Sequence, residues 1–315
     1  ATQSSKNQTV KTESKTNSEL SLHNFRNRFW VTMAQSWMNL AKAVVVLLLA
    51  VVLQSETVVA ETNDCSAYTT KSTCRAKKSA YDCYWKSKKC QQRPNVYFVG
   101  NSFTIYRVPS PKTSLPDLVQ KLANKASSDV GKWTVDSYAT GSAQLRQTVA
   151  DSDVTDEIFA RNRTWLVLQE QSQMLAYNSW TSTTLPAAKK FAQMAAEKGM
   201  QVMLYETWGY GSNYDSFQSA LHTNYQSLAD QIGATLCPAG QVWKKAREEL
   251  GSDYTSLYGS DSKHPSYFGH YVVACAFHAC IHGESPVGLA YYPYGVTEAQ
   301  AALAQQWAAD VILSR

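Results

Sequence analysis

A serine stands at the end of a short apolar segment, where its hydroxyl could act as a nucleophile. The surrounding sequence reads YFVGNSFT at residues 97–104, with Ser102 near its end. The run at 96–100 is short, β-branched and aromatic, which is typical of a buried strand in a parallel sheet. Ligands of such sheets bind beyond the carboxyl ends of the strands, where Ser102 is expected. The alternative role for this serine is to cap the following helix.

A serine hydroxyl needs a base within hydrogen-bond reach, and His264 has a suitable context for that role. It belongs to the segment GSDSKHPS at residues 259–266, ahead of a predicted helix. Asp261 precedes it by three residues, so one tight turn could present both side chains. The carboxylate would then fix the imidazole tautomer and stabilise its protonated form. The same segment also fits a plain turn into a helix, so by itself it does not decide between the two roles.

These residues need a scaffold, and the main part of the chain alternates predicted strands with predicted helices. Strands are expected at 96–100, 133–139, 165–169, 201–205 and 234–237, and helices at 114–128, 143–150, 185–198, 214–231, 266–281 and 297–313. This alternation implies right-handed crossovers and a parallel sheet with helices on both faces. The first four strands each end in polar residues, which therefore meet at one edge of the sheet.

Four blocks of the sequence resemble the SGNH (GDSL-type) hydrolase superfamily in their order and spacing. They are VYFVGNSFT, ATGS, VLQEQS and LYGSDSKHPSYFGHY, and the first, third and fourth are similar to a secreted, largely uncharacterised branch of that superfamily. The resemblance covers about residues 94–290. It implies a three-layer, flavodoxin-like α/β fold and a serine esterase mechanism, and no cofactor or metal is predicted.

Carried over residue by residue, the resemblance implies that Ser102 is the nucleophile. His264 would be the general base and then the general acid, and Asp261 would orient it. The oxyanion hole would consist of the backbone N–H groups of Ser102 and Gly141 and one side-chain amide of the third block.

That third block departs from the usual G-x-N-D pattern of the superfamily. Here it reads Gln169-Glu170-Gln171-Ser172, so Gln171 falls at the asparagine position. Glutamine carries the same amide one methylene further out, which leaves the placement of the donor open. Gln169 is the alternative third donor.

The chain is predicted to have three parts: a polar leader with a signal segment at 1–60, a basic Cys-rich module at 61–93, and the hydrolase domain at 94–315. The apolar run AVVVLLLAVVL at 43–53 is shorter than the ~20 residues that span a bilayer. It fits a signal peptide with cleavage after Ala60, and hence a secreted protein or one of the secretory-pathway lumen. The alternative is an uncleaved anchor and a type II membrane protein.

Cysteines also indicate export. Cys65, Cys74, Cys83 and Cys90 form an even set in a short segment, which is typical of a module held by two disulfides. Three pairings are compatible with the sequence, and a zinc site is the competing interpretation. Three cysteines remain, Cys237, Cys275 and Cys280, of which the last two lie on different faces of a predicted helix and are predicted to be buried thiols.

The charge distribution argues against a nucleic-acid partner. The formal charge is +5, yet residues 1–60 hold six Lys/Arg against three Asp/Glu and residues 61–93 hold eight against three. The predicted hydrolase domain is therefore slightly acidic, whereas a nucleic-acid enzyme would place positive charge around its main cleft.

The predicted activity is removal of short O-acyl groups, acetyl above all, from a polysaccharide, a glycan or another small ester. The Cys-rich module is predicted to contact cell wall or anionic glycan, with a plain stalk as the alternative. A lipase or thioesterase and a non-enzymatic glycan-binding protein are the competing functions. Four aromatic residues in the loops after the third and fourth strands are candidates for stacking on sugars: Trp180, Trp208, Tyr210 and Tyr214.

Overall fold

The computed structural model describes residues 65, 69–76, 83–86, 88–106, 108–109, 112–126, 133–161 and 163–314. By its contacts the chain separates into two units, residues 1–62 and 63–315, and only the second contains described residues. The predicted leader and the apolar run 43–53 lie outside the described part. Within that part, no helix has the length and apolar character needed to cross a membrane.

A five-stranded sheet forms the centre of the second unit. Its strands are β3 (Asn95–Gly100), β6 (Thr134–Ala139), β7 (Trp165–Leu168), β8 (Gln201–Tyr205) and β9 (Thr235–Cys237). They lie in the order β6-β3-β7-β8-β9, and every neighbouring pair is parallel. In chain order this is 2-1-3-4-5, the flavodoxin-like arrangement, whose switch point lies between β3 and β7. The predicted three-layer α/β fold is confirmed.

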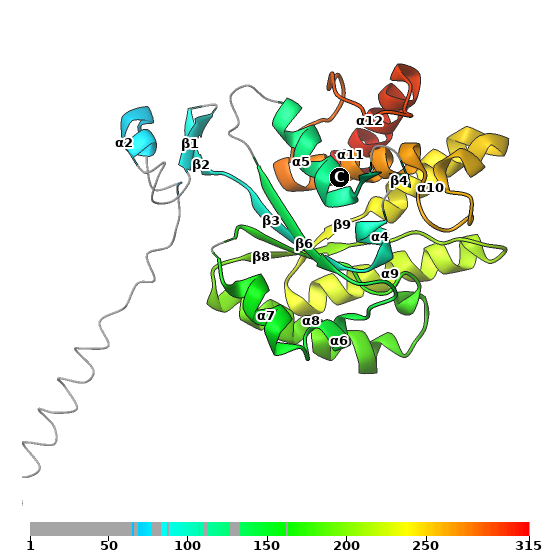
Figure 1. The fold of residues 1–315 in the computed structure, drawn as a ribbon, viewed down its shortest axis with the longest axis horizontal. Helices are drawn as coiled ribbons and strands as arrows, with labels where there is room; N and C mark the ends of the chain where they lie inside the picture. The colour runs from blue at the N-terminus through cyan, green and yellow to red at the C-terminus, as the bar shows by residue number, and fades with distance from the viewer. Residues whose placement is uncertain are drawn as a thin grey trace, which may run out of the picture. The chain divides into compact units, whose positions relative to one another are not determined.

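Helices cover both faces of this sheet (Figure 1). One layer contains α5 (Leu115–Ala126), α10 (Ala239–Leu250), α11 (Tyr267–His282) and α12 (Glu298–Ile312); the other contains α6 (Leu145–Thr148), α7 (Ser152–Phe159), α8 (Trp180–Glu197) and α9 (Tyr214–Ile232). Successive residues of β3 point to opposite faces, so Phe98 packs in the first core whereas Tyr97 and Val99 pack in the second. Both faces are therefore buried, which explains the continuous apolar run in this strand.

Among the helices of these two layers, α7 and α10 differ from the sequence prediction, which has no helix at either place. Helix α7 is short, and α10 contains a glycine near its start, which is a local signal for a break. Only glycine fits at position 240, because the Cβ atom of any other residue would lie 2.1 Å from the Thr207 carbonyl oxygen. Helix α8 begins at Trp180 rather than at Leu185. The remaining short elements are α2 (Lys71–Ala76), β1 (Cys83–Lys86), β2 (Lys89–Gln92), α4 (Ser102–Ile105), β4 (Val108–Pro109), β5 (Lys112–Thr113), η2 (Met174–Ala176) and η3 (Gly251–Leu257).

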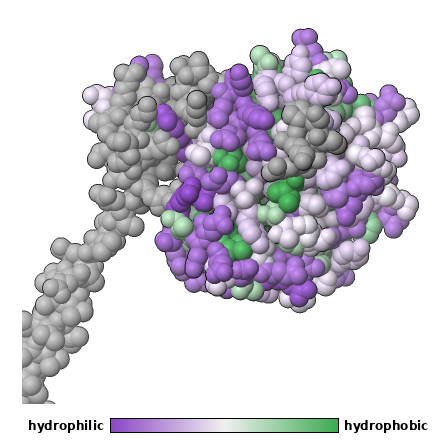
Figure 2. Space-filling view, viewed as in Figure 1, coloured by the Kyte–Doolittle hydropathy of each residue, from purple (hydrophilic) through white to green (hydrophobic). Residues whose placement is uncertain are grey.

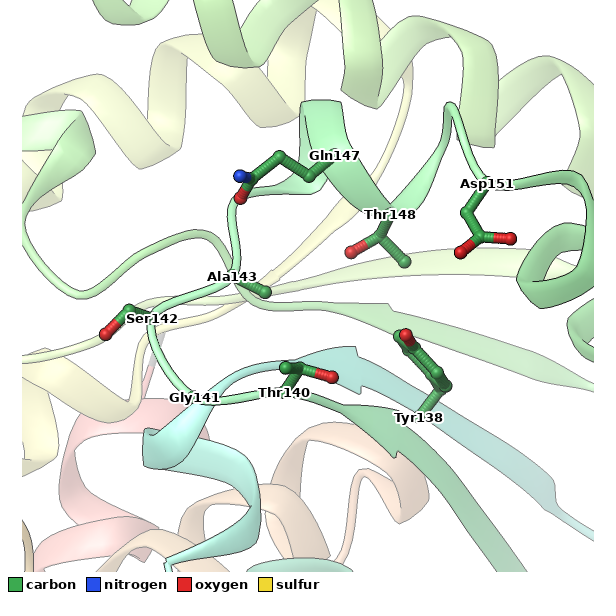
Figure 3. Close-up of a pocket in the computed structure, with 8 residues that line it drawn as sticks. All are labelled: Tyr138, Thr140, Gly141, Ser142, Ala143, Gln147, Thr148 and Asp151. Atoms are coloured by element: carbon green, nitrogen blue, oxygen red, sulfur yellow. The ribbon is translucent and has the colours of Figure 1, made fainter.

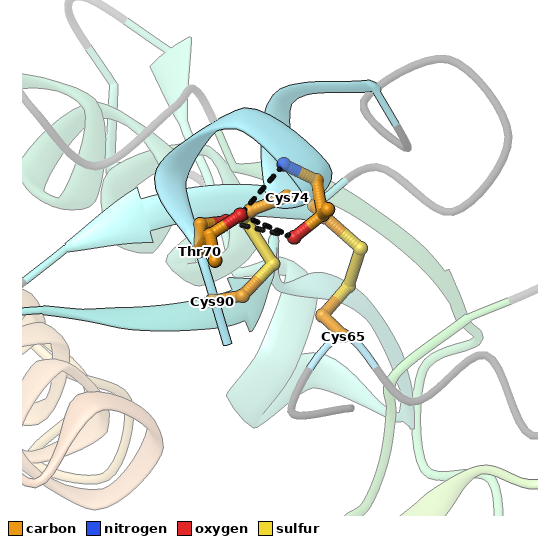
Figure 4. Close-up of a disulfide and its surroundings, with 6 residues drawn as sticks. Cys65, Thr70, Cys74 and Cys90 are labelled. Atoms are coloured by element: carbon orange, nitrogen blue, oxygen red, sulfur yellow. Dashed lines mark hydrogen bonds between the residues drawn. A yellow bond between two sulfur atoms is a disulfide. The ribbon is translucent and has the colours of Figure 1, made fainter. Parts of the chain in front are cut away.

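The Cys-rich segment contains helix α2 and an antiparallel hairpin of β1 and β2. Disulfides join Cys65 to Cys83 and Cys74 to Cys90, and all four cysteines are buried (Figure 4). Three of the sulfur atoms lie close enough together for a metal site, because the two disulfides are adjacent. The prediction of two disulfides is confirmed, and the structure supplies the pairing that the sequence left open.

A third disulfide corrects the prediction that Cys280 is a buried thiol. Cys237 at the end of β9 is bonded to Cys280 in the last turn of α11, so neither is a free thiol. The bridge ties the edge strand to the helix that packs on it. Cys275 is a buried free thiol, as predicted.

Peptide mapping under non-reducing conditions tests this arrangement. We expect three linked peptide pairs, with the third joining Cys237 to Cys280, and one thiol at Cys275. Because Cys275 is fully buried, it should react with an alkylating reagent only after the protein is unfolded. Alkylation of Cys237 after unfolding without a reductant would contradict the third disulfide, because Cys237 is as fully buried as Cys275 in the folded protein.

One face of the molecule is largely hydrophilic. Figure 2 shows that apolar residues on this face are scattered among polar and neutral ones rather than gathered in one broad patch. Scattered apolar residues are ordinary for a protein surface and do not indicate a large docking face.

Candidate active site

Ser102 is the first residue of helix α4, directly beyond the carboxyl end of β3. Asn101 caps this helix, because its side chain accepts a hydrogen bond from the Phe103 backbone N–H at 3.2 Å. The capping role that was the alternative for Ser102 therefore belongs to its neighbour. Gly100 is required by close packing, since a Cβ atom there would lie 2.3 Å from Thr104 Oγ1.

Asn101 also joins three of the loops at this sheet edge. Its side-chain amide donates to the carbonyl oxygens of Ala143, at 3.1 Å, and Glu170, at 3.2 Å. Its backbone N–H donates to Gln169 Oε1 at 3.0 Å. The residue is only 1% exposed, so these bonds are shielded from water. Asn101 thus fixes the position of Ser102 relative to the loops after β6 and β7, a role that the sequence analysis missed.

The two glutamines of the third block have different surroundings. Gln169 is buried, and its amide donates to Asn101 Oδ1 at 2.9 Å and to the Glu170 carbonyl oxygen. Both of its N–H bonds are therefore in use. Gln171 is half-buried and donates one hydrogen bond, to Ser172 Oγ at 3.3 Å, which leaves its second N–H available. Of the two candidates for the third donor, the surroundings favour Gln171.

Glu170 holds the same region together. Its carboxylate accepts hydrogen bonds from the backbone N–H groups of Leu145, at 3.1 Å, and Gln171, at 2.7 Å, and from Thr184 Oγ1 at 2.8 Å. Burial raises the pKa of this carboxyl above its ordinary value, although the hydrogen bonds oppose that shift. Glu170 therefore links the start of α6, the third block and helix α8.

His264 and Asp261 form a hydrogen-bonded pair in the loop before α11. The distance between His264 Nδ1 and Asp261 Oδ2 is 2.5 Å, and Asp261 Oδ1 accepts the backbone N–H groups of Lys263 and His264 at 3.1 and 2.9 Å. Burial alone would raise the pKa of Asp261, but these hydrogen bonds outweigh it and lower the pKa. The two side chains thus meet across one turn.

The imidazole of His264 packs over helix α4. Its ring stacks on Tyr106 with centroids 4.4 Å apart, and it lies 5.4 Å from the Phe103 ring. Tyr106 ends α4 and donates its backbone N–H to the Ser102 carbonyl oxygen at 2.7 Å. The histidine is therefore brought to the helix that begins with Ser102, although the two come from distant parts of the chain.

The second ring nitrogen of His264 is open. Nε2 is buried and has no hydrogen-bond partner among the described residues. Since Nδ1 faces a carboxylate, it carries the proton, which leaves Nε2 as the basic nitrogen. No hydrogen bond from Ser102 Oγ to Nε2 is formed in this structure; such bonds are often long until substrate binds.

The loop after β6 supplies the other predicted oxyanion donor. Ala143 donates to the Thr140 carbonyl oxygen at 3.0 Å, which turns the chain sharply, and Ser142 has a φ of 61°. Within the described part of the chain, neither the Gly141 N–H nor the Ser102 N–H donates a hydrogen bond. Two backbone donors at the same sheet edge are therefore free to bind a developing negative charge.

Three of the four aromatic residues predicted to stack on sugars are buried, so that prediction is wrong for them. Trp208 stacks on Trp243 with centroids 3.9 Å apart, and Trp180 and Tyr214 pack in the cores. Their large apolar surfaces are used in packing the helix layers. Only Tyr210 remains partly exposed.

A second histidine, His270, also lies near Tyr106. The rings of His270 and Tyr106 are 6.3 Å apart, and neither nitrogen of His270 has a hydrogen-bond partner among the described residues. Burial, with a smaller contribution from His264, lowers the pKa of His270 to about 3. The side chain is therefore neutral at ordinary pH and packs, buried, near Tyr106.

His270 is expected to make folding stability depend on pH. The unfolded state binds a proton at this histidine below about pH 6.5, whereas the folded state does not until about pH 3. Stability should therefore fall as pH decreases through this window, by roughly 1.5 kcal/mol between about pH 6.5 and about pH 5. Urea unfolding of wild type and His270→Phe at several pH values measures the free energy of unfolding, whose dependence on pH should be weaker in the variant. The same pH dependence in both proteins would show that His270 can be protonated in the folded protein over this range.

Comparisons with known proteins agree with the fold. No protein-family model matches the sequence, and no curated protein sequence matches it. Among solved structures, a DUF4886 family protein from Bacteroides uniformis is 17% identical, with a TM-score of 0.56 over 70% of this chain and 95% of that one.

Two further solved structures are similar with lower scores. A putative SGNH hydrolase from Slackia heliotrinireducens is 20% identical, with a TM-score of 0.48 over 60% of this chain and 100% of that one. An acetylxylan esterase from Geobacillus stearothermophilus is 15% identical, with a TM-score of 0.49 over 61% of this chain and 95% of that one. At these identities the likeness concerns the fold alone. The chain thus shares with these proteins the three-layer α/β fold that its sequence predicted.

Proposed function

We propose that this protein is a secreted serine esterase that removes short O-acyl groups, acetyl above all, from a polysaccharide or glycan. One observation carries the proposal: His264, paired with Asp261 and open at Nε2, packs on the helix that begins with Ser102. A nucleophile, a base and an orienting carboxylate at the switch point of a parallel sheet support ester hydrolysis.

The proposed reaction proceeds in two halves. Ser102 Oγ attacks the acyl carbonyl carbon while His264 Nε2 takes the hydroxyl proton. The N–H groups of Ser102, Gly141 and Gln171 bind the oxyanion. The C–O bond to the alcohol then breaks, and His264 gives that proton to the leaving oxygen. A water molecule, deprotonated by His264, releases the acid and restores Ser102.

The preference for short acyl groups rests on the polar character of the site's surroundings. The loops at this sheet edge present Thr140, Ser142 and Gln171, together with Lys263, rather than a row of aliphatic side chains. A long acyl chain would leave apolar surface in contact with water there. A lipase or thioesterase is the second candidate, and the two functions differ in how the rate depends on acyl length.

Secretion is supported by the disulfides. Three of them in one chain are typical of an oxidising compartment. The signal segment and its cleavage after Ala60 stay predictions, as does contact of the Cys-rich module with cell wall or anionic glycan.

A series of 4-nitrophenyl esters with increasing acyl length tests the proposed specificity. We expect kcat/KM to be highest for the acetyl ester and to fall steadily toward the octanoyl ester. A true lipid groove would gain about 0.8 kcal/mol per buried CH₂, or nearly fourfold per carbon, so a lipase shows the opposite trend. The Ser102→Ala variant measured in parallel gives the background rate. A rate that rises with chain length would replace the acetylesterase function by the lipase function.

A further inference from the structure

A pocket of about 360 Å³ opens beside the loop after β6, at the edge of the sheet. Figure 3 shows its two walls: Tyr138 lies in β6 and Thr140 directly after it, whereas Thr148 ends α6 and Asp151 precedes α7. Gly141, one of the predicted oxyanion donors, belongs to the lining. The pocket therefore adjoins the proposed site.

A second contact ties the pocket to the nucleophile. Ala143 also belongs to the lining, and its carbonyl oxygen accepts the hydrogen bond from Asn101, the residue before Ser102. A ligand in the pocket would thus lie next to the backbone that positions the reacting groups. This adjacency is what a leaving-group subsite requires.

The walls carry polar atoms that have no protein partner. Within the described part of the chain, the hydroxyls of Tyr138, Thr140 and Thr148 make no hydrogen bond. Thr148 is only 5% exposed as a residue, yet its Oγ1 is not among the buried atoms that lack a partner, so this hydroxyl is accessible from the pocket. Asp151 caps α7, because its Oδ1 accepts hydrogen bonds from the backbone N–H groups of Asp153 at 3.1 Å and Val154 at 3.3 Å. Its Oδ2 accepts no hydrogen bond from the described residues and can bind a ligand. The pocket is therefore equipped to bind a polar molecule.

Size and lining together select the kind of molecule. An acetyl group would fill only a small part of the pocket, whose volume lies in the range of small-molecule sites. Among the described residues that line it there is no Leu, Ile, Val, Phe or Met, so a fatty acyl chain would gain little by entering. A sugar ring fits both features, because its hydroxyls would meet the carboxylate and hydroxyls while its apolar face would lie on the Tyr138 ring.

We propose that this pocket binds one pyranose ring of the alcohol part of the substrate, next to the ester that is cleaved. The proposal rests on the proposed esterase function and adds the recognition of the sugar. Tyr138 supplies the stacking surface. The Thr148 hydroxyl donates or accepts a hydrogen bond with a ring hydroxyl, and the Asp151 carboxylate accepts one. It predicts that sugar acetates are better substrates than acetates of small alcohols.

The test compares an O-acetylated methyl glucopyranoside with ethyl acetate, whose alcohol part is too small to use the pocket. Tyr138→Ala should lower kcat/KM for the sugar ester by about tenfold or more. Thr148→Val keeps the shape of the side chain and should lower it about fivefold, the equivalent of one neutral hydrogen bond. Both variants should hydrolyse ethyl acetate as wild type does.

Two matched variants and one binding measurement complete the design. Tyr138→Phe keeps the ring, so its kcat/KM for the sugar ester should fall much less than that of Tyr138→Ala. Asp151→Asn keeps the helix cap while it removes the charge. Methyl glucopyranoside titrated into Ser102→Ala, followed by NMR, should shift signals of Gly141 and Thr148. Equal losses on both esters, or no loss on the sugar ester, would overturn the pocket's role. Absence of hydrolysis of either ester by wild type would instead overturn the esterase function, and the titration would still test the pocket.

Discussion

Ser102→Ala and His264→Ala should each reduce kcat by about 10³–10⁶, and the double variant should be hardly slower than either single variant. In the proposed mechanism the hydroxyl is activated only by the base, so removal of either group abolishes the same step. His264 is already oriented for this role, because its Nδ1 lies 2.5 Å from Asp261 Oδ2. Single-turnover and steady-state rates with 4-nitrophenyl acetate measure the effect.

The control for these variants is Ser260→Ala in the same loop as the pair. Ser260 is exposed and should be replaceable with little change in rate. Circular dichroism should show that all variants are folded. Independent losses that multiply in the double variant would mean that Ser102 and His264 do not act as one unit, and the triad assignment would be wrong.

Gln171→Ala should lower kcat by about 10²–10³ while KM stays near wild type. An oxyanion donor acts mainly in the transition state, so its removal hardly changes binding of the ground state. One N–H of Gln171 is engaged by Ser172 Oγ, and the other is available for this role. Initial rates over a range of ester concentrations separate the two parameters.

Gln171→Asn is the matched variant, because it keeps the amide and introduces the residue usual at this position in the superfamily that the sequence resembles. It should retain more activity than the alanine variant. A raised KM with unchanged kcat would make Gln171 a substrate-binding residue. Gln169 would not take over the donor role, since both of its N–H bonds are already used.

The central strands β3, β7 and β8 were predictable because each carries a continuous apolar run. The predicted and observed bounds of β8 coincide, and those of β3 differ by one residue. Helix α10 was missed because a glycine in a local sequence indicates a break in a helix. Gly240 instead occurs there because the loop that contains Thr207 approaches the helix too closely for a Cβ atom. Local sequence contains no information about that contact.

Within the site, sequence motifs suggested which residues belong together but not what holds them. Asn101 and Glu170 are buried polar residues whose partners come from other loops, so their roles emerge only from tertiary structure. The third disulfide was missed for the same reason, since its two cysteines are separated by 43 positions. Trp208 looked available for sugars because its partner, Trp243, lies in the unpredicted helix α10.

The most direct test of the central claim is covalent labelling with an organophosphonate that reacts with activated serines. Peptide mass spectrometry should find one adduct per chain, on Ser102, with activity lost in proportion to labelling. Labelling should be absent in Ser102→Ala and much slower in His264→Ala, because the base activates the hydroxyl. An adduct on a different serine, or full activity after complete labelling of Ser102, would contradict the account.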